Sequence, residues 1–318
     1  MNILCEKLSI TYPIIQGGMG NVSNAPLTGA ISQAGALGTI GAGTMAPDEL
    51  ESLILDVKKL TDRPFCINIP ITVQPYLKEV VQLVEKHCIP VVSLSAGNPA
   101  KLAKHFKDQG VKVICVVASV RQAQKAEQAG ADVIVGEGYE AAGINSNFET
   151  TTLTLIPQLV KAVSVPVAAA GGIGDGRGLA AMLSLGVYGV QMGTRFIATE
   201  EALVHKDYKR LIVEASDTDT VVVGRTVGRI RRLLNTEYAK KLAEKEESGV
   251  TAEEFGELTN EDRHISGAIQ GNLADGHLNS GQIAGIVDDL PPVSELIRRM
   301  MAEAEEAAKG LSSKLGIR

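Results

Sequence analysis

AAAGGIGDGRG (residues 168–178) and QMGTRF (residues 191–196) are the two stretches that decide the fold. Each begins as a short apolar run, continues into glycines and leads toward a helical pattern. Continuous apolar runs of this length are typical of parallel strands that are covered on both faces. The two stretches therefore predict the last two strands of a parallel α/β fold, with their glycine-rich ends side by side.

Six earlier segments have the same strand character. They are PIIQG (13–17), LGTIGA (37–42), FCINI (65–69), VVSLS (91–95), KVICVVA (112–118) and DVIVGE (132–137). The segments between them, such as APDELESLILDVKKL (46–60), have apolar residues at helical spacing. Eight strand–helix units predict an α/β fold, a (β/α)8 TIM barrel with a C-terminal helical lid or extension. An open, doubly wound sheet is the alternative.

The pattern changes from about residue 203 to a mixed charged stretch. EYAKKLAEKEE (237–247) and TAEEFGELTNEDRH (251–264) predict exposed helices, and the tail PVSELIRRMMAEAEEAAKGL (292–311) predicts an amphipathic helix packed on the barrel. We therefore expect a barrel made of residues 1–202 plus 280–318, with residues 203–279 as a lid.

Charge and apolar patterning narrow the class of partner. The chain has 31 basic and 37 acidic residues, a formal net charge of −6, and no basic run beyond residues 229–232, so we expect no nucleic-acid partner. No apolar run approaches the roughly 18 residues of a membrane span, and no signal segment starts the chain. A cytoplasmic protein that acts on small molecules is expected, and a homodimer is compatible with the sequence.

The four cysteines are Cys5, Cys66, Cys88 and Cys115. They are widely spaced and include no CxxC pair, so the spacing favours core positions over a metal site. We expect no bound metal.

The carboxyl ends of the predicted strands carry glycines and polar residues. They are residues 17–20, 41–43, Asn68, 95–97, 118–119, 137–138, 171–172 and 193–194. In a barrel these ends would together line the catalytic face, although any single glycine could serve only a tight turn.

The last two of these ends predict a phosphate site. Glycines at 171, 172 and 193 allow backbone N–H groups to approach an anion, and Thr194 adds a hydroxyl donor. A purely structural glycine turn is the alternative.

Seven motifs together carry a resemblance to a known family. They are QGGMG (16–20), INI (67–69), AGNP (96–99), EGYEAAG (137–143), GQIAG (281–285) and the two stretches quoted first. The chain resembles the FMN-dependent barrels that include nitronate monooxygenases and the flavin-dependent enoyl-acyl-carrier-protein reductase. The similarity covers nearly the whole chain, is weakest from about 210 to 265, and leans toward the reductase branch through AGNP and GQIAG.

The resemblance implies a set of FMN contacts. Backbone groups of residues 18–20 would face the flavin ring, and Asn68 and Glu137 would bond around the ring or the ribityl chain. Glu137 could instead cap the following turn. The full implied set is Gly18, Met19, Gly20, Asn68, Glu137, Gly171, Gly172, Gln191, Gly193, Thr194 and Gln282.

The loop AAGINSNF (141–148) departs from the family, which usually has AGGH there and assigns the proton chemistry to its histidine. Ile144 occupies that position. Asn145 and Ser146 are expected to polarise a substrate carbonyl, with water or Tyr139 as the proton source. Of the histidines, His277 is the one to examine, because it precedes GQIAG.

These features predict an FMN-dependent oxidoreductase. NAD(P)H would reduce the flavin, which would then reduce an activated alkene such as an enoyl or other acyl thioester. Oxidation of alkyl nitronates by O₂ is one alternative, and a flavin-binding protein without the family's activity is another.

Overall fold

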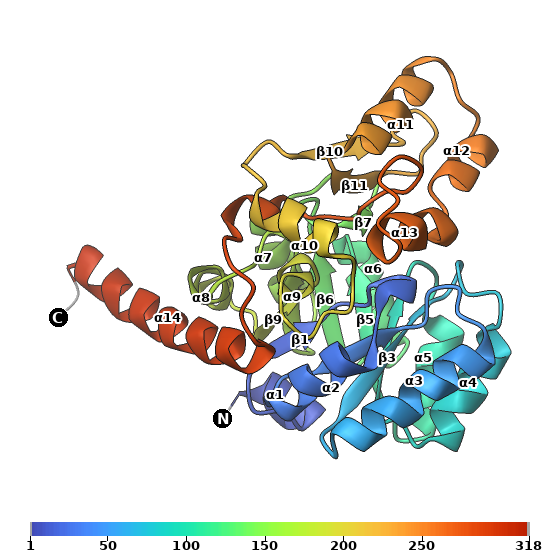
Figure 1. Ribbon diagram of the computed structural model, residues 1–318. Helices are drawn as coiled ribbons and strands as arrows, with labels where there is room; N and C mark the ends of the chain where they lie inside the picture. The colour runs from blue at the N-terminus through green and yellow to red at the C-terminus, as the bar shows by residue number, and fades with distance from the viewer. Residues whose placement is uncertain (1, 317–318) are drawn as a thin grey trace.

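Eight parallel strands form a closed barrel in the computed structural model, which describes residues 2–316 (Figure 1). The sheet order is β1-β9-β8-β6-β5-β4-β3-β2, and a parallel bridge between Ile15 and Leu37 joins the two ends. The strands are β1 (Ile14–Gln16), β2 (Gly38–Gly41), β3 (Phe65–Pro70), β4 (Val91–Ser95), β5 (Lys112–Val117), β6 (Val133–Glu137), β8 (Val167–Ala170) and β9 (Gly189–Met192). The TIM barrel is confirmed, and the open-sheet alternative is wrong because the sheet closes on itself.

Alternate residues of each strand belong to two different cores, which explains the continuous apolar runs. On β6, Val133 and Val135 belong to the cluster inside the barrel, whereas Ile134 belongs to the cluster between strands and helices. The helix α1 (Ile3–Leu8) closes the amino end of the barrel, since its Leu4 and Leu8 pack into the inner cluster. The other end of the barrel is left open to polar groups.

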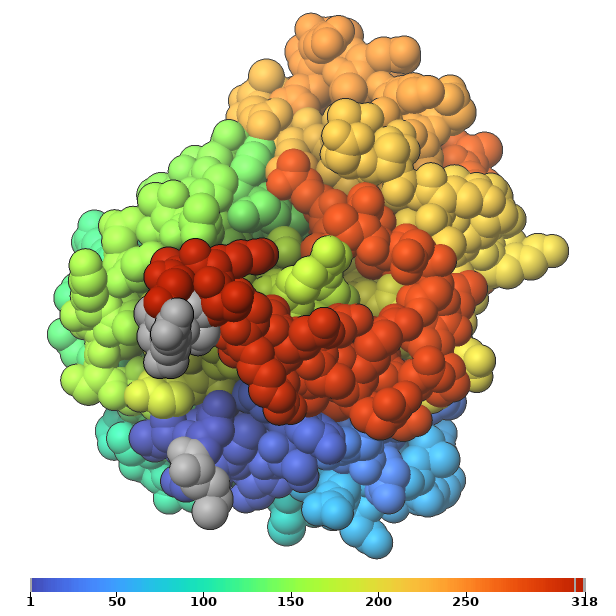
Figure 2. All heavy atoms as spheres, turned by 90° about the vertical axis from the view of Figure 1, so that its left-hand side faces the viewer, coloured from blue at the N-terminus to red at the C-terminus, as the bar shows by residue number. Residues whose placement is uncertain are grey.

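The outer helices follow the strands in turn. They are α2 (Ala25–Gln33), α3 (Pro47–Leu60), α4 (Leu77–Lys86), α5 (Ala100–Asp108), α6 (Val120–Gln128), α7 (Thr152–Ala162) and α8 (Gly176–Ser184). Only a single turn, α9 (Thr194–Ile197), follows β9 directly. The tail helix α14 (Val293–Lys314) packs against α8 and α2 and so takes the eighth position. In Figure 2 this part of the chain, in red, forms a band between the N-terminal quarter and the green segments.

The lid contains strands as well as helices. It consists of α10 (Lys206–Val213), β10 (Thr220–Val223), β11 (Arg231–Leu234), α11 (Glu237–Glu247), α12 (Ala252–Leu258) and α13 (Glu261–Ala268), and projects above the barrel (Figure 1). The expectation of helices alone missed the β10–β11 hairpin. One small core, which includes Leu233, Leu242 and Phe255, lies entirely within residues 221–258. This supports the division at 203–279, which stays a proposal.

The lid is attached to the barrel through backbone pairing. The two-residue strand β7 (Gly143–Ile144), which was expected to be part of a loop, pairs antiparallel with β11. The 3-10 turns η1 (Gly20–Val22) and η2 (Gln282–Ile286) contact the lid helices α13 and α10, respectively. The lid therefore rests on the loop that contains Ile144.

Cysteine positions agree with the sequence in part. Cys5, Cys66 and Cys115 are buried, as expected of core residues, but Cys88 is exposed because it lies in the turn after α4. None of the helices in residues 2–316 is both long enough and apolar enough to cross a membrane.

Candidate functional site

A cavity of about 680 Å³ lies at the carboxyl ends of the barrel strands, between them and the lid. Its volume is within the range of small-molecule sites, roughly 300–1,000 Å³. The structure brings together twelve of the predicted residues around it. They are Gly18, Met19, Gly20, Asn68, Glu137, Asn145, Ser146, Gly171, Gly172, Gln191, Gly193 and Thr194.

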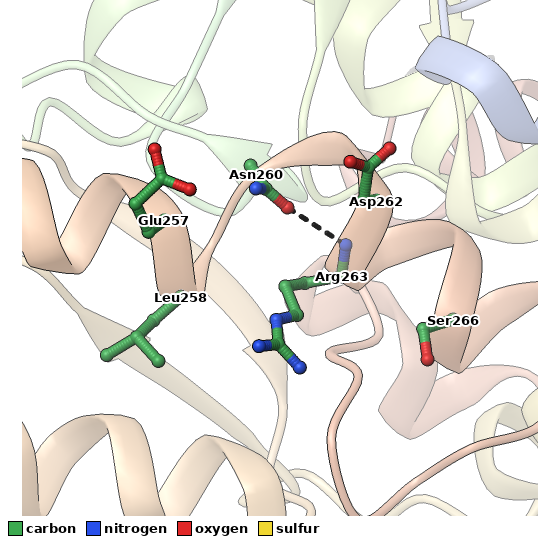
Figure 3. A pocket seen from close by; sticks show the side chains of 6 residues that line it. All are labelled: Glu257, Leu258, Asn260, Asp262, Arg263 and Ser266. Carbon is green, nitrogen blue, oxygen red and sulfur yellow. Dashed lines mark hydrogen bonds between the residues drawn. The ribbon is translucent and has the colours of Figure 1, made fainter.

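A second hollow of about 370 Å³ lies in the lid, at α12 and α13 (Figure 3). Its lining residues are Glu257, Leu258, Asn260, Asp262, Arg263 and Ser266. Asn260 serves the helix itself here, because its Oδ1 accepts a hydrogen bond from the Arg263 N–H at 3.0 Å. No barrel strand and no predicted site residue contributes, so the barrel mouth is the candidate site.

The turn after β1 is built around a close approach. An added Cβ on Gly18 would lie 2.2 Å from Oδ1 of Asn68, and Asn68 is held in place by Ser93 and Ser95. Only glycine therefore fits at position 18 while Asn68 keeps its position. The backbone of this turn is exposed to the cavity, where a flat ligand can contact it.

The ends of β8 and β9 form the second wall of the cavity. Gly171 and Gly172 have φ values of +95° and +74°, which favour glycine. Oγ1 of Thr194 accepts a hydrogen bond from the Gly281 N–H at 3.0 Å, so the hydroxyl proton remains available to an anion. The geometry matches the donor set expected for a phosphate.

The carboxyl group of Glu137 lies at the base of the cavity without a hydrogen-bond donor among the described residues. Burial raises its pKa to about 7. A group in this state can hold a proton near neutral pH and can accept a hydrogen bond from a ligand. The alternative assignment, a cap on the following turn, finds no supporting bond here.

The side chains of the loop 141–146 hold the loop itself as well as facing the cavity. Asn145 is buried, and its Nδ2 already donates to the carbonyl of Ala141 at 2.8 Å. Oγ of Ser146 accepts the Phe148 N–H at 3.2 Å. Ile144 is half exposed. Asn145 therefore holds the loop with one amide hydrogen, while its other amide hydrogen has only a long contact of 3.5 Å to the Gly143 carbonyl and the Ser146 hydroxyl proton stays available.

Two predicted residues, Tyr139 and Gln282, lie outside the cavity lining. The Tyr139 hydroxyl bonds to Arg225, and its ring lies under the guanidinium of Arg232. Gln282 has an exposed side chain, and only its backbone N–H, which bonds to the Glu140 carbonyl, contributes to the loop. The geometry gives no support to Tyr139 as a proton source or to Gln282 as a ligand.

His264 is the functional candidate that sequence reasoning missed. It is buried, lines the cavity, and places Nδ1 3.4 Å from Oε1 of Glu261. Glu261 also accepts the Asn21 N–H at 2.8 Å, next to the turn at Gly20. The spacing Glu261-x-x-His264, one helical turn, was the available signal.

The electrostatics of this pair favour a charged carboxylate. Burial opposes ionisation of Glu261, but bonds and charges from His264, the Asn21 N–H and Arg231 outweigh it and lower its pKa to about 2. His277 stacks on His264 with ring centroids 5.3 Å apart, yet it does not line the cavity. Burial lowers the pKa of His277 to about 3, so this histidine stays neutral.

Asn279 connects this pair to the loop. Its Nδ2 lies 3.4 Å from the ring nitrogens of His264, and its side chain lies next to Gly143. The Oδ1 of Asn279 is buried without a hydrogen-bond partner among the described residues. Buried polar atoms without partners are rare, so this atom is a candidate contact for a ligand.

Comparison with known proteins decides the family. The model of the nitronate monooxygenase family matches residues 1–74 and 70–303. The chain belongs to the nitronate monooxygenase family. A probable nitronate monooxygenase of Staphylococcus saprophyticus is 34% identical, with 94% of this chain and 96% of that protein covered.

Two further proteins that are similar to this chain have names that describe other activities. An octahydro-1H-indene-4-carboxyl-CoA dehydrogenase of Mycobacterium tuberculosis is 34% identical, with 95% of each chain covered. The structure of FabK from Thermotoga maritima is 39% identical, with a TM-score of 0.92 over 99% of each chain. The protein is thus a flavin-dependent oxidoreductase of the nitronate monooxygenase family.

The cavity fits a flavin. The turn at Gly18 brings backbone to the cavity beside the side chain of Asn68, and the glycines at the ends of β8 and β9 bring backbone to it beside Thr194. Gly193 has open space where a Cβ would be, with its nearest neighbour, Met19, 3.9 Å away. An aromatic ring and an anionic tail would therefore meet the wall and the donors that each requires.

The raised pKa of Glu137 predicts a pH dependence of stability in the flavin-free protein. In the folded state this carboxyl keeps its proton up to pH of about 7, whereas the unfolded chain releases it from about 4.5. The stabilisation is complete below about 4.5 and is lost as the pH rises through 7. Glu137→Gln should therefore match the wild type at pH 4.5 but be more stable at pH 8, by roughly 1–3 kcal/mol.

Urea unfolding of both flavin-free proteins at the two pH values measures this difference. The same change at the exposed Glu79 serves as the control and should give no pH-dependent gain. An equal effect of Glu137→Gln at both pH values would show that the pKa of this carboxyl is not raised in the folded state.

Proposed function

We propose that this protein is an FMN-dependent reductase that uses NAD(P)H to reduce an activated alkene, with an enoyl thioester as the substrate class. The observation that carries the proposal is the His264–Glu261 pair, which lies beside the glycine-rich strand ends where the flavin would bind. The loop 141–146 of the same site has no titratable side chain. The M. tuberculosis relative, whose name describes a carboxyl-CoA compound, supports a thioester substrate.

Alkene reduction has two requirements besides the hydride that bound flavin supplies. As hydride adds to the carbon remote from the carbonyl, an electron pair moves to the carbonyl oxygen. A proton must then reach the carbon next to the carbonyl. In this site His264 can supply that proton, and Glu261, whose pKa is lowered, stabilises the charged ring and fixes its orientation.

Oxidation of a nitronate is the second candidate function. The family model and the staphylococcal relative carry that name. A preformed nitronate is already an anion, so this reaction needs no base at position 144. Neutral nitroalkanes would be poor substrates, because their ionisation needs a base at the reacting carbon.

Steady-state oxidation of NADH and NADPH separates these functions. With crotonyl or longer enoyl thioesters under anaerobic conditions, the proposed function predicts substrate-dependent NAD(P)H consumption. O₂ uptake with alkyl nitronates and no NAD(P)H would favour the second candidate. A protein that absorbs at about 450 nm and releases FMN on heating, yet shows neither activity, would be a flavin-binding protein without the family's activity.

His264→Gln tests the proton source. Glutamine can keep bonds to Glu261 and Asn279 but cannot exchange a proton near neutral pH. Stopped-flow measurement should show that reduction of the flavin by NAD(P)H is nearly unchanged, whereas reoxidation by the enoyl thioester slows by roughly 10²–10⁴-fold.

His105 provides a matched control, because it also pairs with a glutamate, Glu85, but on the outside of the barrel. His105→Gln should leave both half-reactions unchanged. If His264→Gln reoxidises at the wild-type rate, His264 does not supply the proton.

A further inference from the structure

Arg231 is directly opposite Ile144 in the pairing between β11 and β7. Residues that face each other in an antiparallel pair place their side chains on the same face of the sheet. Both side chains line the cavity. A lid residue with a permanent positive charge therefore lies across from the position where the family has its histidine.

The guanidinium of Arg231 lacks the hydrogen-bond partners that the guanidinium of Arg232 has. Arg232 donates to the Tyr139 carbonyl and to Thr220 and lies over the Tyr139 ring. Arg231 makes no ion pair and no hydrogen bond with the described residues, and burial lowers its pKa, with the nearby charge of Glu261 opposing the change. The Arg231 side chain is only partly buried, so its protonated guanidinium can donate hydrogen bonds to water or to a ligand in the cavity.

The acidic side chains that line the cavity do not form ion pairs with Arg231 among the described residues. Glu261 is paired with His264, and the Glu140 carboxylate accepts bonds from the N–H and hydroxyl of Thr152. Glu137 keeps its proton up to pH of about 7. Two basic side chains, those of Arg231 and Lys125, line the cavity without a bonded acceptor among the described residues. Lys125 lies at the rim beyond β5, so Arg231 is the cationic group that faces the cavity.

We propose that Arg231 forms a substrate subsite for an anionic oxygen, such as a carboxylate, a nitronate or the enolate oxygen that develops on a thioester carbonyl. The ring of His264 adds a donor to the subsite, whereas the unpartnered Oδ1 of Asn279 is an acceptor for a donor group elsewhere on the ligand. The subsite rests on the proposed function only in taking this cavity as the place where substrate binds.

Binding of butyrate and butyramide to the purified flavin-loaded protein tests the subsite. The two probes share their shape and differ in charge, and neither exchanges electrons with the flavin. Isothermal titration calorimetry, supported by the shift of the flavin absorbance, should show that butyrate binds about tenfold or more tightly than butyramide. In Arg231→Met, which keeps the side-chain stem, this preference should disappear while butyramide binds as before.

Arg229→Met is the matched control, because Arg229 is an exposed arginine beside the same strand and does not line the cavity. It should keep the wild-type preference. The subsite is wrong if Arg231→Met keeps the preference, or if the wild type shows none.

The binding result is independent of turnover, so the two proposals fail separately. Thioester-dependent NAD(P)H oxidation without a butyrate preference would leave the proposed function standing and remove the subsite. A butyrate preference in a protein that does not reduce enoyl thioesters would keep the subsite and indicate a preformed anion as substrate.

Discussion

Gly172→Asp is expected to give a folded protein that does not retain flavin. Position 172 lies at the end of β8 with a φ of +74°, and Asp tolerates this backbone region better than most residues. Its carboxylate would lie beside the proposed phosphate. A pair of like charges at 4 Å costs roughly 4 kcal/mol at an effective dielectric constant near 20, so flavin should bind about a thousandfold more weakly. The flavin-to-protein absorbance ratio after purification measures the loss.

Gly172→Asn is the matched control, because it has the same shape and the same backbone tolerance but no charge. Its nearest neighbour would be Glu140, with Cβ 3.5 Å away, an ordinary contact. The Asn variant should retain flavin to a large extent. A Gly172→Asp protein that is fully loaded with flavin would place the phosphate elsewhere.

Gly18→Ala is expected to have the next largest effect on flavin affinity. The new Cβ would lie 2.2–2.6 Å from the side chain of Asn68, which is fixed by its bonds to Ser93 and Ser95. Either the turn or Asn68 must move, and both belong to the wall that the flavin ring would contact. Overpacking of this kind costs about 1–3 kcal/mol, which corresponds to roughly 5–150-fold weaker flavin binding. Titration of the flavin-free protein with FMN gives the affinity.

Gly17→Ala is the adjacent control for this prediction. Its Cβ would have 3.4–3.6 Å to the side chain of Gln191, which is close to ordinary contact. Flavin affinity should stay within a few-fold of the wild type, so equal losses in both variants would argue against the specific contact with Asn68.

The barrel and its glycine-rich face could be predicted from the sequence because both depend on local patterns. Strands such as β6 are apolar at each of their first four positions, Val133–Gly136, and only a parallel strand between two cores requires this. Glycines at 171 and 172 mark positive φ values in the turn that follows β8. These signals are contained in a few neighbouring residues, so one sequence is enough to interpret them.

The proposed catalytic part of the cavity depends on contacts between residues that are far apart in the chain. Ile144 and Arg231 become neighbours only because β7 pairs with β11, and His264 reaches the cavity only because α13 packs against the turn at Gly20. Contacts with distant residues also explain why Tyr139 and Gln282, which are adjacent in sequence to site residues, do not line the cavity. Periodicity predicts which face of an element is buried, but which distant element covers that face is decided by packing of the complete chain.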